Sequence, residues 1–337
     1  MQLGRVFVDD YYTNGNIFSS QLNDTIYDGR LSKYIELRNY FSKYNISLVT
    51  HDQSFIKDYK FNIYLDTHLL PKSVNELNYL IIVEPPSVLP QNFLVENHLN
   101  FKKIFTWDDS MVDNVRYFKY NISFNLDSKK INLSDKKKAF IMIAKNKFSN
   151  HKNELYSKRV EIINWFRINQ PDKFDLFGVG WDQFIFKQYP FTFFNRFRFI
   201  GKLVNTILGN KYPFFIKDLK SKFDVISDYI FCFCYENIEG IDGYISEKII
   251  DCFKSGTIPI YLGARNINNF VPSDTFIDVR DFKSIEEMII YIEGLDEKQI
   301  NNYLNNISTF MNSKKALIFD SKYNAKLIAD EILKDLE

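Results

Sequence analysis

Short apolar runs separated by stretches of helix length are the feature that most limits how this chain can fold. In the first third, strand-like runs alternate with helical or loop-like segments such as residues 30–43; these runs are 45–49, 61–65, 79–83 and 103–106. The alternation continues further on, with strands expected at 139–144, 174–177, 229–234, 258–262 and 275–278, and helices at 154–169, 219–227, 244–254 and 284–293. This pattern predicts an α/β fold with largely parallel sheets and right-handed crossovers.

The length of 337 residues favours two domains, each large enough to bury its own core. Between residues 121 and 138 the sequence loses its periodicity and becomes polar and charged, as expected of an interdomain linker. We therefore predict a first domain at 1–125, a linker at 126–138, a second domain at 139–312 and a helical segment at 313–337.

Composition excludes several functional classes. The 43 Lys and Arg balance 42 Asp and Glu, which argues against a nucleic-acid partner. No apolar run approaches the roughly 18 residues that span a bilayer, and the amino terminus lacks the apolar core of a signal peptide, so we expect a cytoplasmic protein. Three cysteines are too few for a disulfide framework, the four histidines are scattered, and no Asp-x-Asp pair is present. We therefore predict no metal site and no required cofactor, while stimulation by Mn²⁺ or Mg²⁺ stays open.

One stretch, residues 184–222, is rich in aromatic and basic residues. The simpler interpretation is a partly packed insert that contributes to a cleft. The alternative is a peripheral contact with an anionic membrane, at its inner face, because interleaved Phe, Arg and Lys suit such a surface.

Candidate site residues follow the ends of predicted strands, where open α/β sheets bind ligands. In the second half, Asn237 follows a strand, and a helix predicted from Tyr244 carries Glu247 and Lys248 on one polar face. A lysine near a helix amino terminus suits a phosphate, although an ordinary solvated face would look the same. Arg159 lies in the helix predicted at 154–169, which follows the strand predicted at 139–144. Its planar guanidinium can bind a phosphate through two hydrogen bonds.

The first half contributes Glu84, which ends a strand and precedes two prolines. A carboxylate at this position can face a cleft and act as a general base. An exposed loop carboxylate is the alternative interpretation.

The block from Tyr235 onward resembles the fucosyltransferases of glycosyltransferase family 10. Three motifs carry the resemblance: Tyr-Glu-Asn at 235–237, Tyr-Ile-Ser-Glu-Lys at 244–248 and Gly-Thr-Ile-Pro-Ile-Tyr-Leu-Gly at 256–263. Residues 83–87, 155–159 and 177–181 are similar to further family segments. Tyr235 replaces the commoner Phe and Ser246 the commoner Thr.

The resemblance implies a GT-B fold, in which two Rossmann-like, doubly wound domains face each other across a cleft. It implies GDP-fucose as donor, with Arg159, Asn237, Tyr244, Glu247 and Lys248 binding it and Glu84 as the catalytic base. The expected reaction is an inverting transfer of L-fucose from GDP-β-L-fucose to a hydroxyl of an acceptor oligosaccharide or glycolipid.

The acceptor and linkage expected by resemblance are GlcNAc or Glc, joined α-1,3, in a surface oligosaccharide such as a lipopolysaccharide O-antigen, or in protein glycosylation. Two alternatives remain: a GT-B transferase for another nucleotide sugar, and a nucleotide- or carbohydrate-binding protein without turnover. The oligomeric state cannot be read from the sequence.

Overall fold

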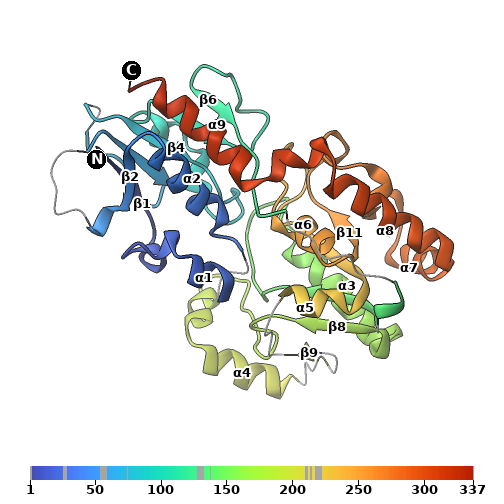
Figure 1. Ribbon diagram of the computed structural model, residues 1–337. Coiled ribbons are helices and arrows are strands. Elements are labelled where there is room, and N and C mark those ends of the chain that lie inside the picture. The colour runs from blue at the N-terminus through green and yellow to red at the C-terminus, as the bar shows by residue number, and fades with distance from the viewer. Residues whose placement is uncertain are drawn as a thin grey trace.

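The chain folds into two α/β units, seen side by side in a computed structural model that describes residues 2–25, 29–53, 59–73, 75–126, 133–136, 138–208, 212, 215–216 and 222–336 (Figure 1). Each unit is built around a parallel sheet of six strands. The α/β class predicted from the alternating pattern is therefore confirmed.

The first sheet has the strand order β2-β1-β3-β4-β5-β6, which is the flavodoxin-like order extended by one strand. Its strands are β1 (Gln2–Phe7), β2 (Ile46–Thr50), β3 (Phe61–Leu65), β4 (Asn78–Ile81), β5 (Lys103–Thr106) and β6 (Tyr117–Lys119). The helices α1 (Ser20–Thr25) and α2 (Ser32–Ser42) lie between β1 and β2 in the chain.

The second sheet has the order β12-β11-β10-β7-β8-β9, which is the Rossmann order. The strands are added outward from β7 to β9 on one side and then from β10 to β12 on the other, so the strand order reverses between β7 and β10. Its strands are β7 (Lys138–Ile143), β8 (Phe174–Phe177), β9 (Phe215–Ile216), β10 (Tyr229–Tyr235), β11 (Ile258–Leu262) and β12 (Ile277–Asp278). Its helices are α3 (Tyr156–Asn169), α4 (Arg198–Ile207), α5 (Lys222–Ser227), α6 (Glu247–Lys254), α7 (Ile285–Glu293) and α8 (Glu297–Met311). Strand β10 is an almost unbroken apolar run because helices cover both faces of a parallel sheet.

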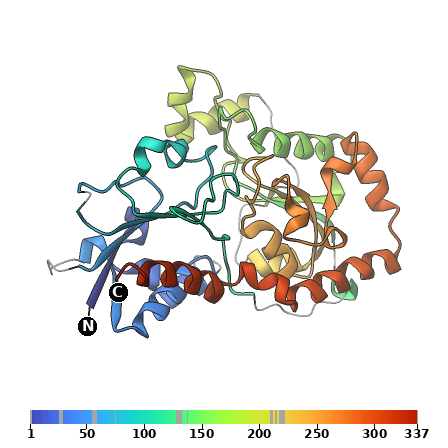
Figure 2. The same ribbon diagram turned by 90° about the horizontal axis from the view of Figure 1, so that it is seen from above.

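The final helix, α9 (Ser321–Leu333), returns to the first domain and packs along α2 (Figures 1 and 2). The Tyr40 hydroxyl donates to Asp330 at 2.8 Å, and Lys103 pairs with Asp335 at 3.2 Å. The two sheets lie on either side of the predicted linker, but residues 127–132 and 137 of that linker lie outside the described residues, so the domain boundaries stay a prediction.

One predicted boundary is wrong in a way that matters for the site. Helix α6 begins at Glu247, three residues after the predicted start at Tyr244. The Ser246 side chain caps the helix by accepting from the Lys248 backbone N–H, and Gly243 just before it adopts a left-handed φ of 83°. Tyr244 therefore lies in a buried loop and does not share a helix face with Glu247 and Lys248.

Candidate donor and base site between the two domains

A pocket of about 400 Å³ lies at the point where the second sheet reverses its strand order. Its wall is formed by the carboxyl ends of β7 and β10 and by the first turns of α6. Three cations line it: Arg159 from α3, Lys222 from α5 and Lys248 from α6. Open α/β sheets bind ligands at such reversal points. Asp251 also lines this one and pairs with Lys222 at 2.7 Å, which leaves Arg159 and Lys248 as its further cations.

Arg159 is nearly buried, at 5% exposure, and holds the end of β10 in place. Its Nη2 donates to the carbonyl oxygens of Tyr235 (2.8 Å) and Glu236 (2.6 Å) and to Asn237 Oδ1 (3.1 Å). None of its hydrogen bonds to the described residues uses Nε or Nη1. The guanidinium therefore organises the strand end while keeping donors for a further acceptor.

Glu236, fully buried, ties the start of α6 to the end of β10. Its two carboxylate oxygens accept from the Ser246 backbone N–H (2.8 Å), the Ser246 hydroxyl (2.6 Å) and Lys248 Nζ (3.1 Å). Burial opposes the charge of Lys248, but Glu236 and Glu247 outweigh it and raise the Lys248 pKa. The Lys248 side chain stays 23% exposed, while its amino group is anchored to Glu236 and Ser246.

Glu247, the first residue of α6, remains ionised. Burial works against its charge, but the nearby Lys248 and Lys222 outweigh burial and lower the pKa of Glu247 to about 2. Its position at a helix amino terminus also favours a negative charge.

Asn237 and Tyr244 lie where the two domains touch. The Asn237 amide donates to the Tyr244 hydroxyl at 3.4 Å, and the Tyr244 ring packs against Trp107 of the first domain with centroids 4.6 Å apart. The Ser87 hydroxyl donates to the Asn237 carbonyl at 3.4 Å and the Ser149 hydroxyl to the Ser87 carbonyl at 2.9 Å. These contacts bring Asn237 and Tyr244 against the first domain.

Glu84 follows β4 on the first-domain side of this boundary. A buried carboxylate, Asp66, shapes its loop by accepting from the backbone N–H groups of Val83 (2.7 Å) and Glu84 (3.1 Å). Asn92 completes the bracket, donating both to Asp66 (2.7 Å) and to the Glu84 carbonyl (3.0 Å). The Glu84 carboxylate itself makes no hydrogen bond or ion pair with any described residue.

Charges from both domains act on Glu84. Burial raises its pKa, and the carboxylates of Asp66 and Glu247 raise it further, while Lys248 and Lys147 oppose them. An unpaired carboxyl group with a raised pKa is suited to accept a proton. The charges of α6 and of Lys147 thus act on Glu84 from across the domain boundary.

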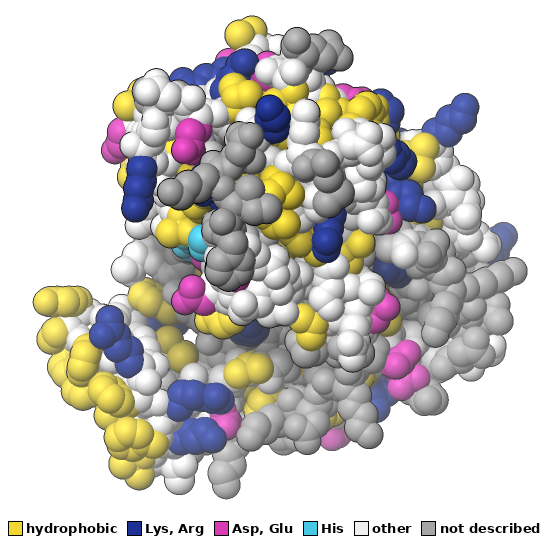
Figure 3. All heavy atoms as spheres, turned by 60° about the vertical axis from the view of Figure 1, so that its left-hand side comes forward, with side chains coloured by type: hydrophobic (Ala, Val, Ile, Leu, Met, Phe, Trp, Pro, Cys, Tyr) yellow, Lys and Arg dark blue, Asp and Glu magenta, His cyan; other side chains and the backbone are white. Residues whose placement is uncertain are grey.

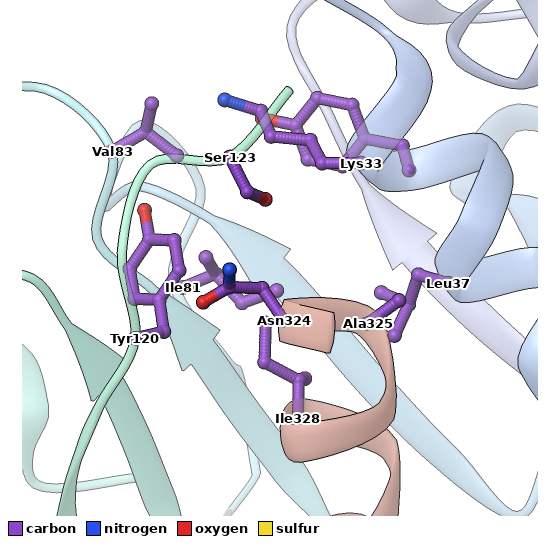
Figure 4. Close-up of a pocket in the computed structure, with 10 residues that line it drawn as sticks. Lys33, Leu37, Ile81, Val83, Tyr120, Ser123, Asn324, Ala325 and Ile328 are labelled. Carbon is purple, nitrogen blue, oxygen red and sulfur yellow. The ribbon is translucent and has the colours of Figure 1, made fainter. Parts of the chain in front are cut away.

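A lysine on α2 also faces this boundary. Lys33 lines a second pocket, of about 300 Å³, together with Val83, Ser123 and residues of α9 (Figure 4). Burial lowers the pKa of Lys33 and outweighs the opposing effect of the carboxylates of Glu247, Asp66 and Glu84. Among the described residues its amino group has no hydrogen bond or ion pair, and it rests over the ring of Tyr34.

The sequence argument did not single out Asp66, Glu236 and Lys33. Asp66 directly follows a strand and Glu236 stands inside the first motif, so both carried the same strand-end signal as Glu84 and Asn237. Lys33 had no local signal, because only tertiary packing brings α2 to the domain boundary.

No group of three or more His, Cys, Asp or Glu side chains in the described part of the chain has an arrangement that could hold a metal ion. The three cysteines are buried and free. None of the helices among the described residues is both long and apolar enough to cross a bilayer.

Structural comparison shows the GT-B fold. The chain is similar to a crystal structure of an α1,3-fucosyltransferase with GDP-fucose, at 17% identity and a TM-score of 0.53, covering 91% of this chain and 81% of that one. It is also similar to Anabaena HepE in complex with UDP and glucose, at 10% identity and a TM-score of 0.57, covering 98% and 99% of the two chains. At these identities the likeness concerns the fold alone.

Sequence comparison gives a narrower and more specific result. An α-(1,3)-fucosyltransferase of Helicobacter pylori is 41% identical over 87 residues, which is 26% of this chain and 18% of that protein, so the match spans less than a fifth of its relative. Residues 195–317 match the profile of glycosyltransferase family 10 (fucosyltransferase), C-terminal part, a span that contains all three motifs but neither Glu84 nor Arg159. Residues 195–317, less than half of the chain, are thus similar to the C-terminal part of the fucosyltransferases of glycosyltransferase family 10.

Proposed function

We propose that this protein is an inverting fucosyltransferase that moves L-fucose from GDP-β-L-fucose to a hydroxyl group of an acceptor glycan. One observation carries the proposal: the Glu84 carboxylate, which has no hydrogen bond or ion pair among the described residues, lies on the first-domain side of the boundary, and the charges of Lys248 and Glu247 on the other side act on its pKa. A transferase needs a base beside the acceptor and cations beside the departing diphosphate, whereas a binding protein needs no base.

In the proposed reaction, Glu84 takes the proton of the acceptor hydroxyl as that oxygen attacks the anomeric carbon of fucose. The bond from this carbon to the diphosphate breaks on the opposite face, and GDP leaves with the bonding electrons. Lys248, Nε or Nη1 of Arg159 and the amino terminus of α6 stabilise the negative charge on GDP. The ionised Glu247 favours the positive charge that develops on the sugar ring.

Tyr244 and Asn237 complete the donor side in this proposal. The Asn237 side-chain oxygen accepts from Arg159, and its amide donates to the Tyr244 hydroxyl. Asn237 therefore links the guanidinium of Arg159 to the residue that contacts the first domain. We propose that no metal is required, because side-chain cations and a helix terminus supply the positive charge, with Mn²⁺ or Mg²⁺ as a stimulant to be tested.

For the acceptor we propose GlcNAc or Glc in a surface oligosaccharide, with an α-1,3 linkage, and a site of action inside the cell. The named relative supports the linkage, being an α-(1,3)-fucosyltransferase itself. The three free cysteines suit a reducing compartment.

Calorimetric titration with GDP-fucose, GDP-mannose and UDP-galactose tests the donor. We expect GDP-fucose to bind at least about 10-fold more tightly than the other two, in EDTA as well as with Mg²⁺. Preferential binding of UDP-galactose would retain the fold but replace the donor, as the likeness to HepE allows. Binding of GDP-fucose without transfer to any glycan acceptor would favour the non-catalytic alternative.

A charge-neutral change next to the base tests its electrostatics. Asp66→Asn keeps an oxygen that can accept from Val83, Glu84 and Asn92 but removes a negative charge that raises the Glu84 pKa. Because the base must be ionised, we expect the acid limb of the pH profile of kcat/KM to move to lower pH. An unmoved limb would show that Glu84 is not the group that titrates, and Asp66→Ala, which removes the acceptor as well, serves as the structural control.

A further inference from the structure

An aromatic lobe projects from the second domain. We define it as residues 184–208, which include a 3-10 helix (Phe191–Arg196) and α4. In Figure 3 it forms the protrusion at the lower left, where hydrophobic side chains gather beside Lys and Arg. Its large apolar side chains with at least a third of their surface exposed are Tyr189, Phe191, Phe193, Phe194, Phe197, Phe199, Leu203, Ile207 and Leu208.

The exposed rings belong to an ordered structure. The Asn195 side chain brackets the backbone of Phe186, with both hydrogen bonds at 2.8 Å, and the Phe184 N–H donates to the Gly201 carbonyl at 2.9 Å. A Cβ at Gly201 would lie 2.8 Å from the Phe184 carbonyl oxygen, so the close approach depends on glycine. The lobe therefore holds its apolar side chains outward instead of burying them.

Helix α4 presents the clearest apolar face. Phe199, Leu203 and Ile207 follow one another at four-residue spacing and are 69%, 60% and 74% exposed. A contiguous exposed apolar face on a soluble protein marks an interaction site.

The charge of the lobe selects the kind of partner. Residues 184–208 contain four basic residues, Lys187, Arg196, Arg198 and Lys202, and no Asp or Glu. All four are exposed, and Lys202 pairs with Asp182 just outside the lobe at 2.9 Å. Phe beside Arg and Lys is the composition that inserts rings at the headgroup level while its cations meet anionic lipids.

A second copy of the chain fits this face less well. A symmetric contact places the same patch against itself, which would bring the cations of both copies together without an acidic group in either lobe. We propose that the aromatic lobe binds the surface of an anionic membrane. The predicted insert continues to residue 222, but residues 209–211, 213–214 and 217–221 lie outside the described residues.

The lobe is anchored beside the donor pocket. Just before it, the Trp181 indole donates to the Ala144 carbonyl at 2.7 Å and Asn146 to the Gly180 carbonyl at 2.9 Å. Ala144 follows β7 and lines the pocket of the candidate site. Binding through the lobe would therefore bring the pocket close to the lipid surface, and, resting on the proposed function, this favours an acceptor glycan carried by a lipid.

Vesicle flotation tests the proposal. We expect the protein to float with vesicles of equal parts phosphatidylcholine and phosphatidylglycerol, and not with phosphatidylcholine alone. Replacing the α4 face (Phe199→Ser, Leu203→Ser and Ile207→Ser together) should weaken binding by about 10-fold or more. Replacing Arg196 and Arg198 by Gln should weaken it by about 10-fold and reduce its salt dependence. Ile290→Ser, at a 66% exposed position on α7, is the matched control and should change nothing.

Equal flotation with both vesicles, or with neither, would overturn the proposal. So would a concentration-dependent dimer that the α4 variant abolishes, because the face would then join two copies. Calorimetry with GDP-fucose separates this result from the proposed function: lobe variants should bind the donor as the unaltered protein does, and flotation reports membrane binding whether or not GDP-fucose is the donor.

Discussion

Replacing Glu84 by Gln is expected to abolish fucose transfer while leaving GDP binding intact. Gln has nearly the same shape and leaves the backbone bracket from Asp66 and Asn92 in place, but it cannot accept the acceptor's proton. Loss of a general base costs about 10²- to 10⁴-fold in turnover. Single-turnover transfer and GDP calorimetry on the same preparation measure the two properties separately.

The same variant should be more stable than the unaltered protein at neutral pH. Because the folded-state pKa of Glu84 lies above its ordinary value of 4.5, its contribution to stability is present below that value and is lost as the pH rises through the folded pKa. Gln does not ionise, so the variant avoids this loss of stability at neutral pH. The difference in stability between the variant and the unaltered protein should therefore shrink at acid pH. Near-normal turnover in Glu84→Gln would reject Glu84 as the base. Reduced stability at pH 7 would contradict the burial and carboxylate repulsion that raise its pKa.

The second large effect is expected at Lys248. Lys248→Met removes a cation proposed to bind the diphosphate, and such a charged hydrogen bond contributes about 1.5–3 kcal/mol, or roughly 10- to 100-fold in affinity for GDP. It also leaves the buried Glu236 without its ion pair, which typically costs about 3–5 kcal/mol of folding stability. With Lys248→Met alone, a loss of GDP affinity could therefore come either from the missing contact or from the loss of folding stability.

A double variant separates the two roles. Glu236→Gln with Lys248→Met removes both charges but leaves an oxygen to accept from Ser246. We expect thermal stability to recover largely while GDP binding stays weak. If GDP binding recovers together with stability, Lys248 only supports the fold of the site and does not contact the donor.

The local pattern of apolar residues was sufficient to predict most strands of the two sheets. The strands β3, β5, β8 and β11 have the predicted bounds, because buried parallel strands are apolar runs bounded by polar loops. The inner strand β1 was not predicted, since Gly4 and Arg5 interrupt its apolar pattern. It is a strand because it pairs with β2 on one side and β3 on the other, and both partners come later in the chain.

The candidate site divides in the same way. Its donor-side members follow strand ends or open a helix, so sequence position alone pointed to Asn237, Glu247 and Lys248. The partners that set their charge and geometry are distant in sequence: Glu236 is 12 residues from Lys248, and Asp66 is 18 residues from Glu84. Local periodicity contains no information about such pairs, because they form only when separate strands end at one edge.

The sequence by itself determined the α/β class, the strand ends that carry chemistry and the aromatic, basic character of the lobe, because each depends on the order of neighbouring residues. Only the tertiary structure decided that α9 packs on the first domain and that the charges of α6 act on Glu84 across the domain boundary. These features depend on burial and on charge between distant segments, and both arise only after the two domains have come together.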